Sequence, residues 1–150
     1  MSNYRNRPKG NYIQEASWQE LYMLTESWKN DLEFYLLDIE FLERLVETYF
    51  VKYLTNQNFE EIRGLQRELL EINSKCENLL KRIQIHFGHI VDLIDQPLMY
   101  DESIFRTEHE LLEHEISKFE VMLKAVRYAV FTITKDVLES KKPKYIWKYN

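Results

Sequence analysis

Apolar residues recur at alternating spacings of three and four along most of this 150-residue chain. The repeat forms three seams, which run from Trp18 to Tyr53, from Ile62 to Leu93 and from Phe105 to Val137. A heptad pattern of this kind gives each helix one apolar face, and only partner helices can cover that face. The chain has only three glycines and three prolines, which suits long helices. The sequence therefore predicts an all-α fold of long helices packed side by side.

Local signals place the ends of three helices, at residues 17–54, 58–95 and 102–140. Ser17 and Glu20 have the S-x-x-E spacing of a capping box, which opens the first helix. Pro97 disfavours a helical conformation in the residue before it and ends the second helix, and Pro143 is expected to end the third. Because both connections are short, neighbouring helices should be antiparallel. The predicted architecture is an up-down-up bundle, which dimerisation could enlarge.

Two polar segments flank the predicted bundle domain at residues 16–140. Residues 1–15 have no periodic apolar face and are expected to form a flexible basic arm. Residues 141–150 interleave lysines with aromatic residues, a composition that can contact single-stranded nucleic acid or a lipid surface. The net charge of −5 opposes attraction to such anionic partners. We therefore expect no nucleic-acid or membrane partner, and we keep weak binding through residues 141–150 as an alternative.

The chain carries no signal for export or membrane insertion. Residues 1–12 lack the apolar core of a secretory signal, and no run approaches the roughly 20 apolar residues of a membrane span. The single cysteine, Cys76, excludes an intrachain disulfide and lies on the second seam, where a small buried residue is expected. These features predict a cytoplasmic location.

The first predicted helix is apolar on more than one side. Opposite its seam lies a second row of large apolar residues, which includes Phe34, Leu37, Phe41 and Val51. A helix of this kind is buried on more than one side, and an exposed apolar stripe on a soluble protein usually marks a contact. We expect a homodimer with this row at its interface. The alternatives are that another protein or a terminal tail of the same chain covers the row.

Histidines interrupt two of the seams. His86 and His109 stand where apolar residues are expected, and the short connection between the second and third helices places them at the same height. Glu113 shares a helix face with His109, because residues four apart lie on one side of a helix. Imidazoles and a carboxylate inside a bundle can bind Zn or Fe. The metal hypothesis assigns His86, His109 and Glu113 as ligands, with His89 or Glu108 next to them.

The same histidines are also compatible with a structural polar layer. Di-iron carboxylate bundles use Glu-x-x-His on two helices, and no histidine of this sequence follows that pattern. Buried polar residues can instead fix the register of packed helices, with His86 and His109 bonded to each other, to Thr25 or to a carboxylate. The sequence has no motif of nucleotide binding or hydrolytic catalysis. It therefore predicts a non-catalytic interaction or scaffold protein, with a metal-binding bundle as the alternative.

Overall fold

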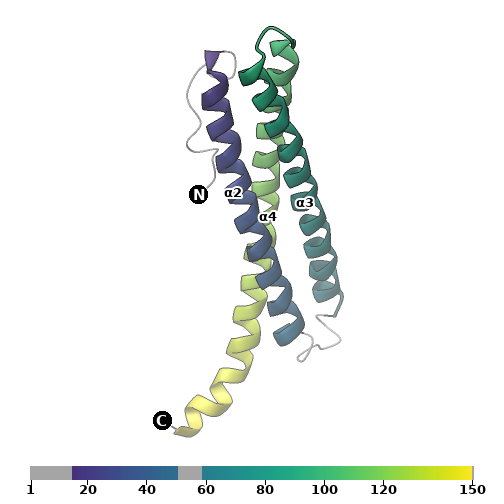
Figure 1. Ribbon diagram of the computed structural model, residues 1–150. Coiled ribbons are helices and arrows are strands. Elements are labelled where there is room, and N and C mark those ends of the chain that lie inside the picture. Colours follow the sequence, from purple (N-terminus) through teal and green to yellow (C-terminus); the bar gives the residue numbers. More distant parts are fainter. Residues whose placement is uncertain (1–14, 51–58, 150) are drawn as a thin grey trace.

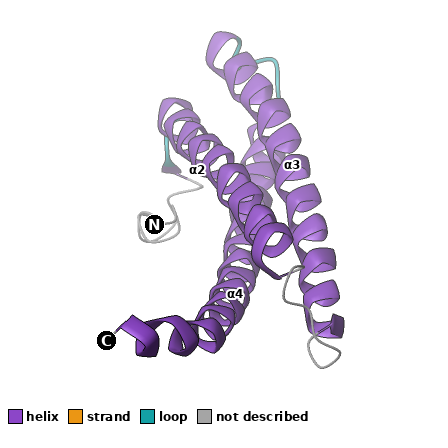
Figure 2. Ribbon diagram, turned by 90° about the horizontal axis from the view of Figure 1, so that it is seen from below, coloured by secondary structure: helices purple, strands orange, loops and turns teal. Residues whose placement is uncertain are grey.

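The structure is a computed structural model that describes residues 15–50 and 59–149. Its main elements are the helices α2 (Trp18–Leu45), α3 (Phe59–Asp95) and α4 (Glu102–Tyr149). They lie side by side, with α3 antiparallel to the other two (Figure 1). Figure 2 shows that the described residues form helices and short connections, with no strand among them. The predicted all-α, up-down-up bundle of three helices is confirmed.

The predicted end of the first helix falls partly outside the described residues. After Leu45 the chain continues into a five-residue π-helical segment, η2 (Val46–Phe50), in which hydrogen bonds join residues five apart instead of four. Val46 still contributes a buried side chain to the core. Residues 51–54 lie outside the described residues, and these include Val51, which was predicted at an interface. Most of the arm predicted at residues 1–15 also lies outside them.

The predicted end of the third helix at residue 140 is wrong, because α4 continues through Pro143 to Tyr149. A proline inside a helix removes one backbone hydrogen bond and displaces the carbonyl four residues earlier, which bends a helix without necessarily ending it. Figure 1 shows α4 extending past the other helices and curving away from them toward its C-terminus. Residues 141–149 of the predicted tail are therefore an extension of α4.

The three predicted seams form the core. The side chains of α3 that are buried follow the heptad spacing without a break: Ile62, Leu65, Leu69, Ile72, Cys76, Leu79, Ile83, His86, Ile90 and Leu93. Leu32 and Ile39 of α2 and Val130 of α4 are fully buried against them. Each such side chain contributes roughly 1.5–3 kcal/mol through removal of apolar surface from water. The seams therefore supply most of the driving force for folding.

Polar side chains bridge α2 and α4 beside the core. The Tyr35 hydroxyl donates to Glu120 Oε2 at 2.5 Å, and Arg127 Nε donates to Asp38 Oδ2 at 3.0 Å. Burial raises the pKa of Tyr35, and the neighbouring Glu120 raises it further. Tyr35 is therefore held as a neutral hydrogen-bond donor, and these bridges help to align two helices that run in the same direction.

Arg106 connects the start of α4 to the start of α2. Its guanidinium lies over the Trp18 ring, 4.4 Å from the ring centroid, and donates to the Ala16 carbonyl oxygen at 3.0 Å. The predicted capping box is present next to this contact: the Ser17 amide donates to Glu20 Oε1 and the Glu20 amide donates to Ser17 Oγ. The N-terminus of α2 is thus satisfied locally and fastened to α4.

We predict that Arg106→Ala lowers the free energy of unfolding by about 1–3 kcal/mol, because it removes a cation–π contact and a hydrogen bond to a partly buried carbonyl. Arg106→Lys should recover less than half of the loss, since lysine lacks the planar group that stacks on Trp18. Urea denaturation followed by circular dichroism measures both. Arg82→Ala is the control, because Arg82 pairs with Glu115 at the exposed surface and such pairs contribute about 0–1 kcal/mol. Equal losses for Arg106→Ala and Arg82→Ala would contradict the assignment.

The predicted burial of Cys76 is confirmed. Its side chain is fully buried, and Sγ lies 3.3 Å from the Leu32 carbonyl oxygen, to which the thiol can donate. Burial raises the pKa of this thiol to about 12, with a smaller contribution from Glu77. Cys76 is therefore a neutral core residue at physiological pH.

We predict that a soluble disulfide reagent modifies Cys76 only when the bundle opens. The labelling rate without denaturant should be at least about 1,000-fold below the rate in denaturant, as the stability of a typical domain implies. Because the chain has a single cysteine, the absorbance of the released thiolate reports this site alone. Labelling of the native protein at the rate of the denatured one would contradict the core position of Cys76.

Candidate metal site in the bundle core

Two buried imidazoles meet between α3 and α4, near the turn that joins these helices. His86 and His109 have no exposed surface, and His86 Nε2 lies 3.0 Å from His109 Nδ1. The structure thus brings together the two histidines that the sequence placed at one height. Thr25, the other buried polar residue in this region, donates to the Leu21 carbonyl of its own helix at 2.7 Å.

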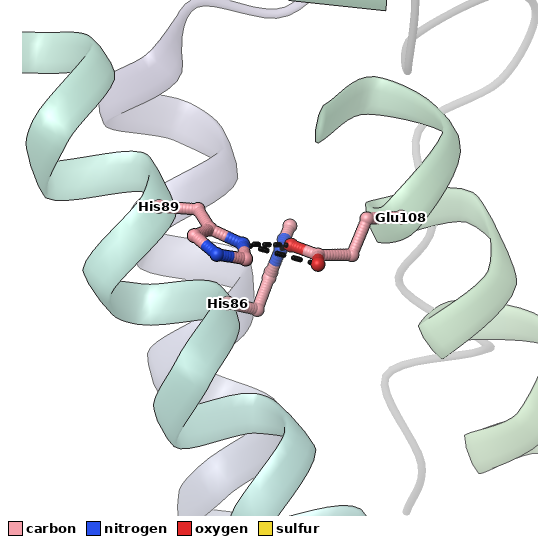
Figure 3. A group of neighbouring side chains, drawn as sticks. All are labelled: His86, His89 and Glu108. Atoms are coloured by element: carbon pink, nitrogen blue, oxygen red, sulfur yellow. Dashed lines mark hydrogen bonds and ion pairs between the residues drawn. The ribbon is translucent and has the colours of Figure 1, made fainter. Parts of the chain in front are cut away.

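The carboxylate of Glu108 lies between two histidines of α3 (Figure 3). Glu108 Oε1 is hydrogen bonded to His86 Nδ1, and His89 Nδ1 lies 2.8 Å from Oε1 and 3.0 Å from Oε2. The two imidazoles therefore present the same ring nitrogen to one carboxylate. We refer to His86, His89, Glu108 and His109 together as the histidine layer.

Of the three predicted ligands, only His86 belongs to the group of potential metal donors, in which His89 and Glu108 stand in place of His109 and Glu113. Successive residues are about 100° apart around a helix, so Glu108 and Glu113, which are five residues apart, leave α4 in directions about 140° apart. Glu108 lies on the side of α4 that faces His89, whereas Glu113 lies on another side and more than a turn farther from the connection. There α3 presents Arg82, which pairs with Glu115.

Burial and mutual contacts determine the charges in the histidine layer. Burial lowers the pKa of His109 to about 3, and the neighbouring His86 and Arg106 act in the same direction. Burial also lowers the pKa of His86, although Glu108 partly opposes this. For Glu108, burial alone would raise the pKa, but the hydrogen bonds from His89 and His86 outweigh it and the net shift is downward. At neutral pH the layer thus contains a carboxylate and two neutral buried imidazoles.

These charges determine the direction of each hydrogen bond. An ionised carboxylate only accepts, so His86 donates to Glu108 through Nδ1–H. A neutral imidazole carries one proton, so His86 Nε2 accepts from His109 Nδ1–H. This leaves an unprotonated Nε2 on His109, which is buried and has no hydrogen-bond partner among the described residues. A buried polar atom in that state costs about 1–3 kcal/mol.

Aromatic rings enclose the layer on two sides. Trp28 of α2 stacks on His109, with ring centroids 4.4 Å apart and planes inclined by 28°. Phe105 packs against His89 at a centroid distance of 4.8 Å. Trp28 is itself almost fully buried, so the seam of α2 fixes the plane of His109. This face-to-face contact of Trp28 with an imidazole was not predicted from the sequence.

A second candidate site is the outer stripe of α2, which we define as Phe34, Leu37 and Phe41. Their exposed fractions are 63%, 65% and 53%, although all three are large apolar side chains in the middle of a regular helix. The Phe34 ring contacts the edge of Tyr35, so the stripe borders the polar bridges between α2 and α4. Among the described residues, no other part of the chain buries this face.

Comparisons of the chain with protein-family models, curated proteins and solved structures found no match. Within the described ranges, none of the helices combines the length and apolar character needed to cross a bilayer.

We predict that metal-free protein loses stability as the pH falls below about 6.5. Above that value an imidazole is neutral in both the folded and unfolded states. Below it, unfolded His109 takes up a proton that the folded state excludes until about pH 3, so the free energy of unfolding falls by up to about 1.4 kcal/mol per pH unit. The lowered pKa of His86 acts in the same direction. Chemical denaturation with a chelator at pH 7.5, 6.5 and 5.5 measures the slope.

His109→Phe should reduce this slope, because phenylalanine can stack on Trp28 but does not titrate. The control is His114→Gln, since His114 is exposed and its replacement should leave the slope unchanged. A wild-type protein of constant stability from pH 7.5 to 5.5 would contradict the burial of neutral imidazoles.

Proposed function

We propose that this protein is a non-catalytic interaction module that self-associates through the outer stripe of α2. The observation that supports the proposal is the exposure of Phe34, Leu37 and Phe41, each more than half accessible on one helix face. Single exposed apolar residues are common on protein surfaces, but a row of aromatic and aliphatic side chains along a helix is typical of a contact surface. Burial of this row against another apolar surface would release the water that covers it.

The order of residues in the stripe suits a second copy of the same chain. In a twofold dimer the same patch occurs on both partners and must be self-complementary. With two copies of α2 antiparallel, Leu37 near the axis would face Leu37 of the other copy, and each phenylalanine would face the other one: Phe34 against Phe41. The three residues are almost evenly spaced about Leu37, as this symmetry requires.

Charges beside the stripe favour the same orientation. Glu33 precedes the stripe and Arg44 follows it, and both are exposed. An antiparallel pair brings Glu33 of one copy toward Arg44 of the other, whereas a parallel pair would place like charges together. Complementary charges of this kind select the partner and the register more than they add affinity. Within one chain Arg44 pairs with Glu40 at 2.7 Å, an exposed contact that can be exchanged at little cost.

We predict a wild-type dimer that Leu37→Glu converts into a folded monomer, because it places two carboxylates at the centre of the interface. Light scattering coupled to size-exclusion chromatography measures the mass, and circular dichroism verifies the helices. Leu70→Glu is the matched control, since Leu70 of α3 has the same exposed fraction of 65% as Leu37; it should remain dimeric. A monomeric wild type, or a dimer that survives Leu37→Glu, would overturn the proposal.

The orientation can be tested by exchanging charges. Glu33→Arg and Arg44→Glu should each weaken the antiparallel dimer, and the double variant should restore it because the opposite charges meet again. In a parallel dimer Glu33 would face Glu33 of the other copy and Arg44 would face Arg44. Each substitution would then replace one pair of like charges by another, so the double variant should not recover affinity that a single variant loses. Dissociation constants from sedimentation at two salt concentrations separate these outcomes, since contributions between exposed charges are screened by salt.

Weak binding of nucleic acid or membrane through residues 141–150 stays a prediction, because the side chains of this segment lie outside those that the structure describes.

A further inference from the structure

We propose that His86, His89 and Glu108 bind a divalent first-row transition-metal ion, and that His109 holds His86 in position behind it. This site is independent of the proposed self-association: it lies between α3 and α4, whereas the outer stripe is on α2.

The donor atoms of the three residues already converge. One nitrogen from each imidazole and one carboxylate oxygen lie within 4.8 Å of one another, and Figure 3 shows both rings directed at the Glu108 side chain. The two histidines are three residues apart on α3, so they share one face of that helix, and Glu108 closes the group from α4. Ligands from two packed helices are the usual way in which bundles build metal sites.

The donor atoms must move apart to admit an ion, because Glu108 is hydrogen bonded to both His86 and His89. Zinc is bound at about 2.0–2.2 Å by nitrogen and oxygen ligands, so tetrahedral ligand atoms lie about 3.3 Å apart. His89 Nδ1 and Glu108 Oε1 are 2.8 Å apart, and they would have to separate by about half an ångström. Their side chains are 34% and 32% exposed, which leaves room for that movement. His86 is fully buried and provides the fixed point.

His109 gives His86 the second partner that metal-binding imidazoles normally have. A ligating histidine usually donates its other N–H to a neighbouring acceptor, which sets the tautomer and the ring orientation. Coordination through His86 Nδ1 puts its proton on Nε2, from which it donates to His109 Nδ1 across the 3.0 Å contact. His109 then carries its own proton on Nε2. Metal binding therefore reverses the hydrogen bond between the rings without changing the number of protons on either.

Stability alone gives a weaker account of this layer. Apolar residues of similar volume often stabilise a core as well as a buried polar group does, or better, and here one ring nitrogen of His109 has no partner among the described residues. Buried polar groups without a partner are rare in native proteins, so stability alone does not explain this one. A metal ion accounts for the convergence of these four polar side chains at one height of the bundle.

The ligand set favours an ion with open coordination positions. Two imidazoles and one carboxylate are the protein ligands of some catalytic zinc sites and of non-haem Fe(II) sites. The remaining positions would lie on the partly exposed side of His89 and Glu108, where water or a small anion can complete the shell. Closed structural zinc sites use four protein ligands, so we expect exchangeable binding.

The test is a calorimetric titration of Zn²⁺ into untagged, chelator-treated protein. We expect one equivalent to bind. His89→Gln and Glu108→Gln should each weaken binding by more than the roughly 10- to 100-fold that follows loss of an outer hydrogen-bond partner. The matched controls are His114→Gln and Glu110→Gln, which change the same residue types at exposed positions and should bind as the wild type does. Circular dichroism verifies that each variant folds. If Glu108→Gln does not fold, the test rests on His89→Gln and its control, because His89 is partly exposed.

Nitrogen-15 NMR of the histidine rings reports which ring nitrogen of His86 is protonated. On addition of Zn²⁺ the proton should change from Nδ1 to Nε2, whereas binding of Zn²⁺ at the protein surface would leave it on Nδ1. Absence of binding at about 100 μM Zn²⁺ would overturn the proposal. So would binding that both ligand variants retain. If Glu113→Gln abolished binding and Glu108→Gln retained it, the proposed role of Glu108 would be wrong and Glu113 would be the carboxylate ligand.

Discussion

The antiparallel register between α3 and α4 positions most of the other features of this molecule. The turn between them is short, and the Met99 amide donates to the Gln96 carbonyl at 3.1 Å within it. Asp101 Oδ1 then accepts from the Ser103 amide at 3.0 Å at the start of α4. With the connection held in this way, the two apolar seams meet in one register, and a displacement by one helical turn would separate His86 from His109. The histidine layer is thus a consequence of how the turn sets the pairing of the seams.

The core can tolerate this polar layer because the polar groups satisfy one another almost completely. Glu108 accepts from two imidazoles and His86 uses both ring nitrogens, so most of the cost of burying them is recovered. The Trp28 ring stacks on one face of the His109 imidazole and covers it. The layer lies near one end of α3, whereas the middle and the other end of that helix bury an unbroken apolar seam. The apolar seam therefore supplies most of the stability of the bundle, and the layer adds a group of polar residues near one end of it.

The sequence was sufficient to predict the features that depend on periodicity. Heptad spacing identified the buried face of each helix, and counting through a short turn placed His86 beside His109. Two details depended on information that spacing does not carry. The i, i+4 rule relates Glu113 to His109 on the same helix, but it does not indicate which side of α4 faces His89 of the neighbouring helix, and Glu108 lies on that side. Pro143 predicts the end of a helix, but a proline costs a helix about 3 kcal/mol and can bend it without ending it, and α4 continues through this position.

The histidine layer contacts the inward side of α2 through Trp28, whereas the outer stripe lies on its outward side, and this arrangement makes the two proposed sites separable. Trp28 points inward to His109, whereas Leu37 lies outward, nine residues further along, or about 13 Å along the helix axis. Sites at such a distance with no shared partner usually contribute independently to free energy. Coupling would require Trp28 to move, and in a close-packed interior that movement disturbs many neighbours at once. The stripe and the histidine layer are thus expected to act independently, so that failure of one proposal leaves the other standing.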